Sequence, residues 1–256
     1  MSLLTLSFSL SFIGIALFLS YREQLALEKD MLVGTVRAII QLFIIGYILQ
    51  YVFDLRSLPG LLSILTVMVV VAVQNASKRA TALPRSQSIL YIAGALILSE
   101  VLTLGLLLGL GIVPAEPRFI IPFSGMIIGN SMIAAGLTVS RLQAELLNQK
   151  PLVLTALTLG ATSRQAASRA IKAAVKAGMS PTIDGMKTVG LVQLPGMMTG
   201  QIIAGANPVE AVKYQLLIQL VLTAATAIAS MAVGLWSYRP FFTADHQLSP
   251  CYPNKT

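Results

Sequence analysis

The chain has 256 residues, of which 55% are hydrophobic and only 11% charged, and its formal net charge is +8. A mean hydropathy of +0.79 excludes a water-soluble globular domain with an ordinary polar surface. We therefore predict an all-α, polytopic membrane protein, in which the excess of Lys and Arg reflects the cytoplasmic bias of these residues and does not indicate nucleic-acid binding.

Apolar runs long enough to cross a hydrocarbon core of about 30 Å predict about seven spans. They lie near residues 3–20, 32–53, 58–75, 88–113, 119–140, 188–205 and 211–236. Fourteen of the 18 Lys and Arg residues fall in the connections on one side or in the tail, and three fall on the other side. This bias predicts an N-terminus outside and a C-terminus in the cytoplasm, for a multi-pass protein of the cell (inner) membrane.

Two stretches lie outside this bundle. Residues 21–30 are charged with apolar residues between them, which fits either a short helix at the interface or a solvated loop. Residues 238–256 are mixed and rich in proline, so we expect a poorly ordered cytoplasmic tail after a permease domain of residues 1–237.

Charged residues inside spans are costly and therefore mark functional candidates. Arg37 and Glu100 are such residues, and Gln41 lies one helical turn after Arg37 on the same face. All three are candidates for a substrate pathway. Two alternatives remain: Arg37 and Glu100 only neutralise one another, or Arg37 extends to the nearby interface.

The fifth and sixth spans combine small residues with amides. Glycines four residues apart let helices approach closely, and a proline inside a span frees a backbone carbonyl that can line a cavity. Candidates for helix packing, a gate or a dimer interface are Gly125, Gly129, Pro195, Gly196 and Gly200. Further candidates for the substrate pathway are Asn130, Gln193 and Gln201.

The same two spans carry four methionines, whose thioether sulfur can bind soft metals. These are Met126, Met132, Met197 and Met198. Packing is the commoner role of methionine in an apolar helix, so metal ligation is the weaker of the two interpretations.

Residues required for enzyme chemistry are missing from the spans. The single histidine, His246, lies in the tail, so no Ser and His dyad or HExxH zinc site can form within the membrane. The sequence also contains no GxxxxGK[ST] motif. We therefore expect a transport protein without enzyme activity or a cofactor of its own, and any ATP and Mg²⁺ would be bound by a partner chain.

A polar, alanine-rich stretch at residues 154–187 separates the fifth and sixth predicted spans. Helical spacing places Arg169, Lys172 and Lys176 on one face and mostly alanine methyl groups on the opposite face. Such a helix can dock in a groove of a partner protein or lie on anionic lipid.

The end of this basic helix is predicted at Gly178, a residue that commonly terminates helices. Ser180 as N-cap and Pro181 at the first helical position would then begin a second helix, with Asp184 in its opening turn. This arrangement predicts a sharp bend, after which the second helix continues into the sixth span.

Residues ALTLGATSRQA, followed by the basic helix, resemble the coupling motif of ABC-transporter permeases. More specifically, GMIIGNSMIAAGLTVSRL and GMSPTIDGMKTVGLVQLPGMMTGQIIAGANP resemble the iron-export ABC permease family, whose plant relatives are linked to aluminium tolerance. The resemblance extends over nearly the whole chain. One position departs from it: the coupling motif usually has a glutamate six residues before its glycine, and Leu154 stands there.

The resemblance implies a homodimer of this chain with two separate P-loop ATPase subunits docked at the coupling segment. It implies export of iron or another metal species. The residues it assigns to ATPase coupling are Gly160, Ala161, Thr162, Arg164, Gln165, Arg169, Lys172, Lys176, Pro181 and Asp184.

Other functions remain open on the residues alone. The spans hold one carboxylate, no histidine and no cysteine, so a nucleotide sugar or an organic anion attracted to Arg37 is an alternative cargo. A secondary transporter with Arg37 and Glu100 as relay groups is an alternative mechanism, although no paired repeat supports it.

Overall fold

The computed structural model describes residues 3–54 and 58–249, and in this part of the chain ten α-helices form, with no β-strand. The helices are α1 Leu3–Arg22, α2 Glu28–Asp54, α3 Leu58–Ser77, α4 Arg85–Gly109, α5 Pro117–Asn148, α6 Lys150–Thr158, α7 Ser163–Ala166, α8 Ser168–Thr188, α9 Gly196–Ile203 and α10 Pro208–Ser237, and a 3₁₀ helix, η1, follows at Arg239–Phe241. The predicted all-α class is confirmed. These residues form two compact units that divide after residue 57.

The first unit contains the helices α1 and α2, which pack against each other. Of the two alternatives left open for residues 21–30, the loop holds for residues 23–27, and the residues on either side belong to α1 and α2. The Ser20 hydroxyl donates a hydrogen bond to Glu28 Oε1 at 2.7 Å across this loop.

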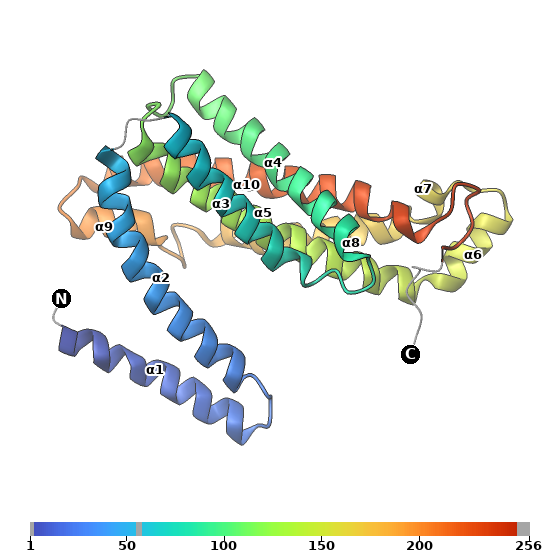
Figure 1. Cartoon of the computed structure of the whole chain (residues 1–256), viewed down its shortest axis with the longest axis horizontal. Helices are drawn as coiled ribbons and strands as arrows, with labels where there is room; N and C mark the ends of the chain where they lie inside the picture. Colours follow the sequence, from blue (N-terminus) through green and yellow to red (C-terminus); the bar gives the residue numbers. More distant parts are fainter. Residues whose placement is uncertain (1–2, 55–57, 250–256) are drawn as a thin grey trace. The chain divides into compact units, whose positions relative to one another are not determined.

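The second unit is built around α5. This helix has 32 residues and packs against α3, α4, α8 and α10, as Figure 1 shows. Its buried residues alternate between large aliphatic side chains and small ones such as Ala134 and Ala135, which let four neighbours surround one helix. At about 1.5 Å per residue, α5 is roughly 48 Å long, so it extends beyond the hydrocarbon core that it can cross.

Hydroxyl groups join three of these helices inside the apolar bundle. Ser99 on α4 lies 3.0 Å from the Ser131 hydroxyl on α5, and its own hydroxyl donates to the Ala225 carbonyl on α10 at 3.0 Å. All three residues are buried. Polar groups in a membrane interior must find partners within the protein, and this junction does so across α4, α5 and α10.

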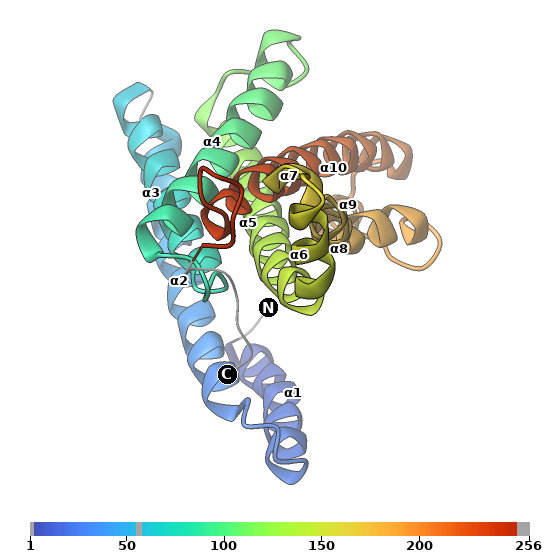
Figure 2. The same cartoon turned by 90° about the vertical axis from the view of Figure 1, so that its right-hand side faces the viewer.

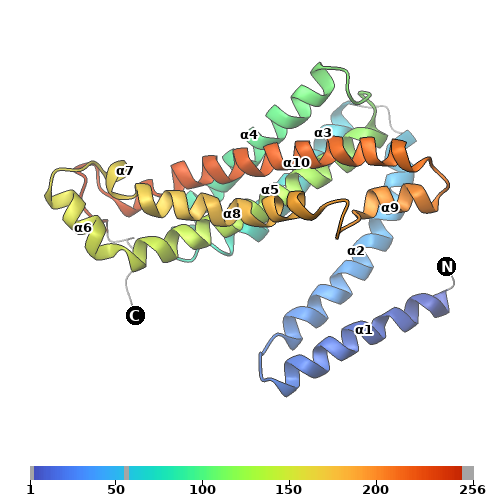
Figure 3. The same ribbon diagram turned by 180° about the vertical axis from the view of Figure 1, so that it is seen from behind.

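Five helices among the described residues are long and apolar enough to cross a membrane, and α1 contributes a shorter apolar helix at Phe8–Arg22. The sixth predicted span, residues 188–205, is not one helix. The chain leaves α8 at Thr188, forms a non-helical connection, and resumes as α9, which has only eight residues (Figure 3). In that connection the amides of Leu191, Val192 and Gln193 all donate to the Thr188 carbonyl, which closes a tight turn.

The predicted bend at Gly178 is also wrong, because α8 continues through Gly178 and Pro181 to Thr188. Gly178 is buried, and a Cβ atom there would collide with the Thr138 hydroxyl and lie 2.8 Å from the Ala134 carbonyl. This glycine therefore permits close approach of α8 to α5 rather than ending a helix.

The helices α6 and α7, the start of α8 and η1 gather at one end of the second unit, which Figure 2 views from that end. The expectation of a poorly ordered tail is wrong for residues 238–249. Phe241 and Phe242 are buried in the main hydrophobic cluster, and the Ser249 amide donates to the Phe241 carbonyl. Residues 250–256 of the predicted tail lie outside the described residues.

Candidate functional site

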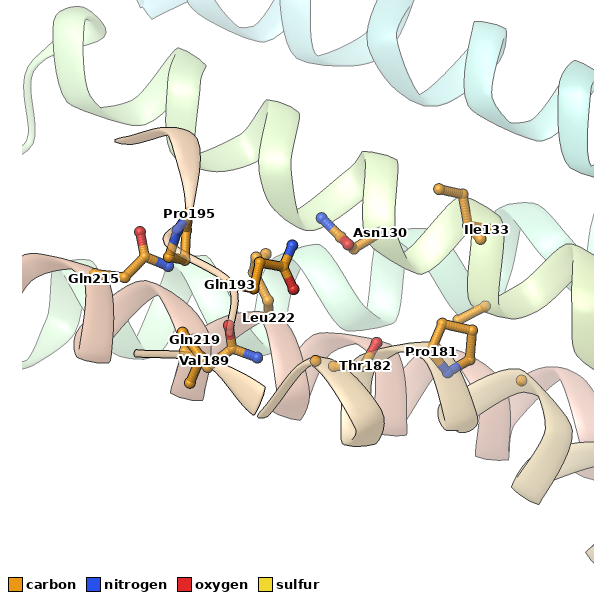
Figure 4. A pocket seen from close by; sticks show the side chains of 13 residues that line it. Asn130, Ile133, Pro181, Thr182, Val189, Gln193, Pro195, Gln215, Gln219 and Leu222 are labelled. Atoms are coloured by element: carbon orange, nitrogen blue, oxygen red, sulfur yellow. The ribbon is translucent and has the colours of Figure 1, made fainter. Parts of the chain in front are cut away.

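A cavity of about 280 Å³ lies between α5, the second half of α8, the α8–α9 connection and α10 (Figure 4). Its apolar walls include Ile133, Pro181, Pro195 and Leu222. Its polar lining consists of one hydroxyl and four amides: Thr182, Asn130, Gln193, Gln215 and Gln219. Within the described part of the chain, no charged side chain lines this cavity.

The amides come from three different segments. Asn130 lies on α5, Gln193 lies in the α8–α9 connection, and Gln215 and Gln219 lie one turn apart on α10. Figure 4 shows the Asn130 and Gln193 amides pointing toward one another. The Asn130 amide nitrogen already donates to the Met126 carbonyl at 2.8 Å, which fixes the orientation of this side chain.

Gln215 is the most buried amide of the set, with 7% of its surface exposed. Its Oε1 atom is buried and has no hydrogen-bond partner among the described residues. A buried amide oxygen without a partner costs roughly 1–3 kcal/mol. This oxygen has almost no accessible surface of its own, so the Gln215 side chain has to turn before a donor in the cavity can reach it.

Of the predicted pathway residues, the structure brings Asn130 and Gln193 to this cavity and leaves Gln201 outside its lining, on α9. Arg37 and Gln41 lie on α2 in the first unit and are exposed. The sequence analysis missed Thr182, Gln215 and Gln219. Two amides one turn apart in the otherwise apolar residues 211–236 were the signal that could have identified the last two.

Glu100 lies on α4 and is 7% exposed. The buried Ser124 hydroxyl on α5 neighbours this carboxylate, and no charged side chain among the described residues forms a salt bridge with it. The predicted pairing of Glu100 with Arg37 would join two separate units and stays a prediction.

The predicted packing glycines differ in whether a neighbouring helix lies close to them. A Cβ atom on Gly125 would contact Met68 at 3.3 Å, whereas Cβ atoms on Gly129, Gly196 and Gly200 would meet nothing within 4 Å. Within one chain, only the first of these glycines lies against a neighbouring helix. A role for the other three in a dimer interface or gate stays a prediction.

The four methionines occupy different surroundings. Met126 and Met132 pack against the two hydrophobic clusters, and Met132 also accepts a long hydrogen bond of 3.5 Å from the Asn75 amide through its sulfur. Met198 is buried and Met197 is exposed on α9. These positions agree with packing, the commoner role, and a metal site here stays a prediction.

The predicted coupling segment forms a short, well-capped elbow between α6 and α7. Gly160 has φ +86°, in the left-handed region that glycine adopts without strain. After it, Thr162 and Gln165 form a capping box, in which the Gln165 side chain accepts from the Thr162 amide at 2.9 Å. The elbow therefore has a defined shape, and Leu159 at its tip is 82% exposed.

One expectation about the basic helix is wrong. Its methyl-surfaced face is not free to dock on a partner, because Ala167, Ala170 and Ala174 are fully buried in the main hydrophobic cluster of the chain itself. What remains exposed is the basic face: Arg169, Lys172 and Lys176, together with Arg164 and Gln165 on α7. Asp184 and Lys187, farther along α8, are exposed and pair with each other at 3.2 Å.

The C-terminal segment adds a contact that the sequence analysis did not foresee. His246 Nδ1 lies 2.8 Å from the Ser163 hydroxyl and accepts from the Ser163 amide at 3.3 Å. Since Ser163 is the first residue of α7, the tail holds the start of the coupling elbow.

Comparisons with known proteins agree on one family. Residues 3–242 match the family model described as "Uncharacterised protein family (UPF0014)". The chain is 42% identical over 248 residues to the UPF0014 membrane protein YjkA of Bacillus subtilis, with 97% of this chain and 98% of the relative covered. It is 37% identical over 251 residues to the "Probable iron export permease protein FetB" of Escherichia coli, covering 95% and 93%.

A plant relative shows similar agreement. The chain is 38% identical over 235 residues to the protein ALUMINUM SENSITIVE 3 of Arabidopsis thaliana, with 91% of this chain and 85% of the relative covered. No solved structure gives a significant match.

Proposed function

The chain belongs to the UPF0014 family of multi-pass membrane proteins, and we propose that it is the membrane-spanning permease subunit of an ABC transporter that exports iron or another metal species. ATP and Mg²⁺ would be bound by a separate P-loop ATPase on the cytoplasmic side. Two copies of this chain would form the transport path.

The exposed elbow at Gly160 is the observation that carries the proposal. A capped turn, the exposed Leu159 and the exposed cations Arg164 and Arg169 come together there, at one end of the second unit. A single exposed leucine is common on protein surfaces, so the ordered turn and the cations beside it carry the argument for a docking site. The basic face of α8 starts directly beyond this turn.

The burial of the alanine face of α8 changes which surface would dock on the partner. Because the alanine face of α8 is buried inside the chain, the partner would contact the tip of the elbow and the basic side chains, such as Arg164 and Arg169. Leu154, which stands where related motifs have a glutamate, is 42% exposed and would make an apolar contact instead of a polar one.

Co-purification tests this role directly. The tagged full-length chain, expressed in cells that supply the ATPase, should retain a P-loop ATPase, and cells with the transporter should hold less iron under iron excess than cells without it. Unchanged cellular iron would contradict the export assignment. Association that survives disruption of the elbow would contradict the docking site.

One observation favours a second mechanism. Glu100 is a buried carboxylate with no oppositely charged partner among the described residues, which is the kind of group that relays protons or ions in gradient-driven transporters. Transport by this chain alone in liposomes, in the absence of any ATPase, would support that mechanism over the ABC assignment.

A further inference from the structure

We infer that the cavity between α5, α8 and α10 binds its cargo as an uncharged metal chelate, in which an organic ligand with oxygen donors encloses the metal. The identity of the cargo as a metal species rests on the proposed function. The preference for an uncharged, hydrogen-bonding molecule rests on the cavity itself.

The lack of charge in the lining argues against a bare metal ion. A divalent cation that enters a membrane protein gives up very strongly bound hydration water, and binding sites replace that water with several oxygen ligands, carboxylates among them. The described lining offers four neutral amides and one hydroxyl and no carboxylate. Glu100, the buried acid of α4, lies outside this lining.

The same lack of charge argues against an anionic cargo. A diphosphate or polycarboxylate group is normally held by Arg or Lys. Three charged residues lie within a turn of the lining residues of α8, and all are exposed: Lys176, and Asp184 and Lys187, which pair at 3.2 Å. None of them lines the cavity, so neither a cation nor an anion finds a counter-charge within it.

The amides suit a neutral chelate well, because each carries both donors and an acceptor. Gln215 supplies the sharpest observation: it is 93% buried, as its 7% exposure implies, and its Oε1 atom has no partner among the described residues. The Gln193 and Asn130 amides point toward one another farther along the cavity, and Pro195 lies between Gln193 and Gln215 (Figure 4). A chelate with hydroxyl or amide groups on its surface could hydrogen-bond to Gln193 and Asn130, and to Gln215 once that side chain turns toward it.

The apolar walls and the volume of the cavity also favour an organic chelate over a bare ion. Ile133, Leu222 and the rings of Pro181 and Pro195 present hydrocarbon surface, which suits the methyl and methylene groups of an organic ligand. The volume of about 280 Å³ approaches the ~300–1,000 Å³ typical of cavities that hold small organic molecules, and exceeds what a single ion requires.

Equilibrium dialysis of the full-length protein in lipid nanodiscs tests the inference with three forms of radioactive iron at equal concentration. These are ferrous ion kept reduced by ascorbate, anionic ferric citrate, and neutral tris(acetohydroxamato)iron(III). We expect the neutral complex to bind at least about tenfold more tightly than either charged form. Tighter binding of ferrous ion or ferric citrate would overturn the inference.

Variants of the lining provide the second test. Gln215→Leu and Gln193→Leu should each weaken binding of the neutral complex by about tenfold, the effect of losing one or two buried hydrogen bonds. Gln215→Glu should instead raise the affinity for ferrous ion, because it adds a carboxylate to a neutral lining. Gln74→Leu, at an exposed amide of α3 outside the cavity, is the matched control and should leave binding unchanged. Unaltered binding in both leucine variants of the lining would refute the site.

Iron efflux from intact cells separates this inference from the proposed function. If ferrous ion binds best while cells still export iron, the export role stands and the neutral-chelate inference fails. If the neutral complex binds as expected and cellular iron does not change, the cavity is supported and the export role fails.

Discussion

The Ser163 hydroxyl and His246 Nδ1 lie 2.8 Å apart although 83 residues separate them in the sequence. The Ser163 amide donates to the same ring nitrogen, so that nitrogen acts as an acceptor and the imidazole proton lies on Nε2. Phe241 and Phe242 anchor the segment that carries this histidine in the hydrophobic core. The end of the chain thereby holds the beginning of α7, where the proposed ATPase contact lies.

Replacing His246 should loosen this attachment. His246→Ala removes the acceptor for two donors of Ser163, which should speed hydrogen exchange at residues 242–249 and at the amides of α7 and cost about 1 kcal/mol of stability. His246→Asn keeps an acceptor on a shorter side chain and should restore part of the protection. Identical exchange in the alanine variant and the unaltered protein would contradict the contact.

Gly178→Ala should destabilise the bundle by about 1–3 kcal/mol, because the added methyl collides with the Thr138 hydroxyl where α8 crosses α5. Thermal unfolding in detergent measures the loss. Gly185→Ala is the matched control: it lies on the same helix, and its Cβ would meet nothing within 4 Å. Equal melting temperatures for the two variants would show that the helices do not approach as closely as described.

The elbow should depend on the backbone conformation of Gly160. An L-residue at φ +86° is strained by about 1–2 kcal/mol, although the space around this glycine is open. Gly160→Val should therefore reduce co-purification of the ATPase while the bundle stays folded. Thr162→Ala, which breaks the capping box without altering Gly160, should reduce it by a smaller amount. Full association in both variants would exclude the elbow as the docking site.

Glu100→Gln should raise the melting temperature, because it replaces a buried acid that has no counter-charge in the described part of the chain with a neutral side chain of nearly the same shape. Under the ABC mechanism, ATP-driven transport should persist in this variant. Higher stability combined with abolished transport would identify the carboxylate as a relay group instead, and a lower melting temperature would contradict its isolation.

Gly129→Leu and Gly200→Leu distinguish folding within one chain from assembly of two. Both glycines face open space in the single chain, so the substitutions should leave thermal stability of the monomer nearly unchanged. If these glycines lie at a dimer interface, the leucine side chains should shift the protein toward monomer in cross-linking and light-scattering measurements. A dimer that forms equally well in the double variant would place the interface elsewhere.

The sequence predicted the apolar helices well, because each needs only a long hydrophobic run. Hydropathy could not show that residues 188–205 break into a turn and a short helix, since Leu191, Val192 and Leu194 keep the average high whether or not the backbone is helical. Gly178 and Pro181 suggested a bend for a local reason, and close packing of α8 on α5 overrode it.

The alanines of α8 show a different limit of sequence reasoning. Small residues on one face indicate close packing, but they do not say whether the neighbour belongs to another protein or to the same chain. Ala170 and Ala174 pack against other residues of the same chain. The cavity could be predicted only in part, because Asn130 and Gln193 stood out within glycine-rich spans, whereas Gln215 lies in an ordinary apolar one.

The continuity of α8 also has a mechanical meaning. Its 21 residues extend about 30 Å as one helix, from the turn beside the elbow to Thr188, where the connection that carries Gln193 begins. A continuous helix transmits a displacement along its axis, so a small displacement imposed at Ser168 can reach the cavity. Pro181, which lacks a backbone N–H, is the weakest point of the helix on that path. With Gly178 pressed against Thr138 near the middle of the helix, a rotation there would move its two ends in opposite directions.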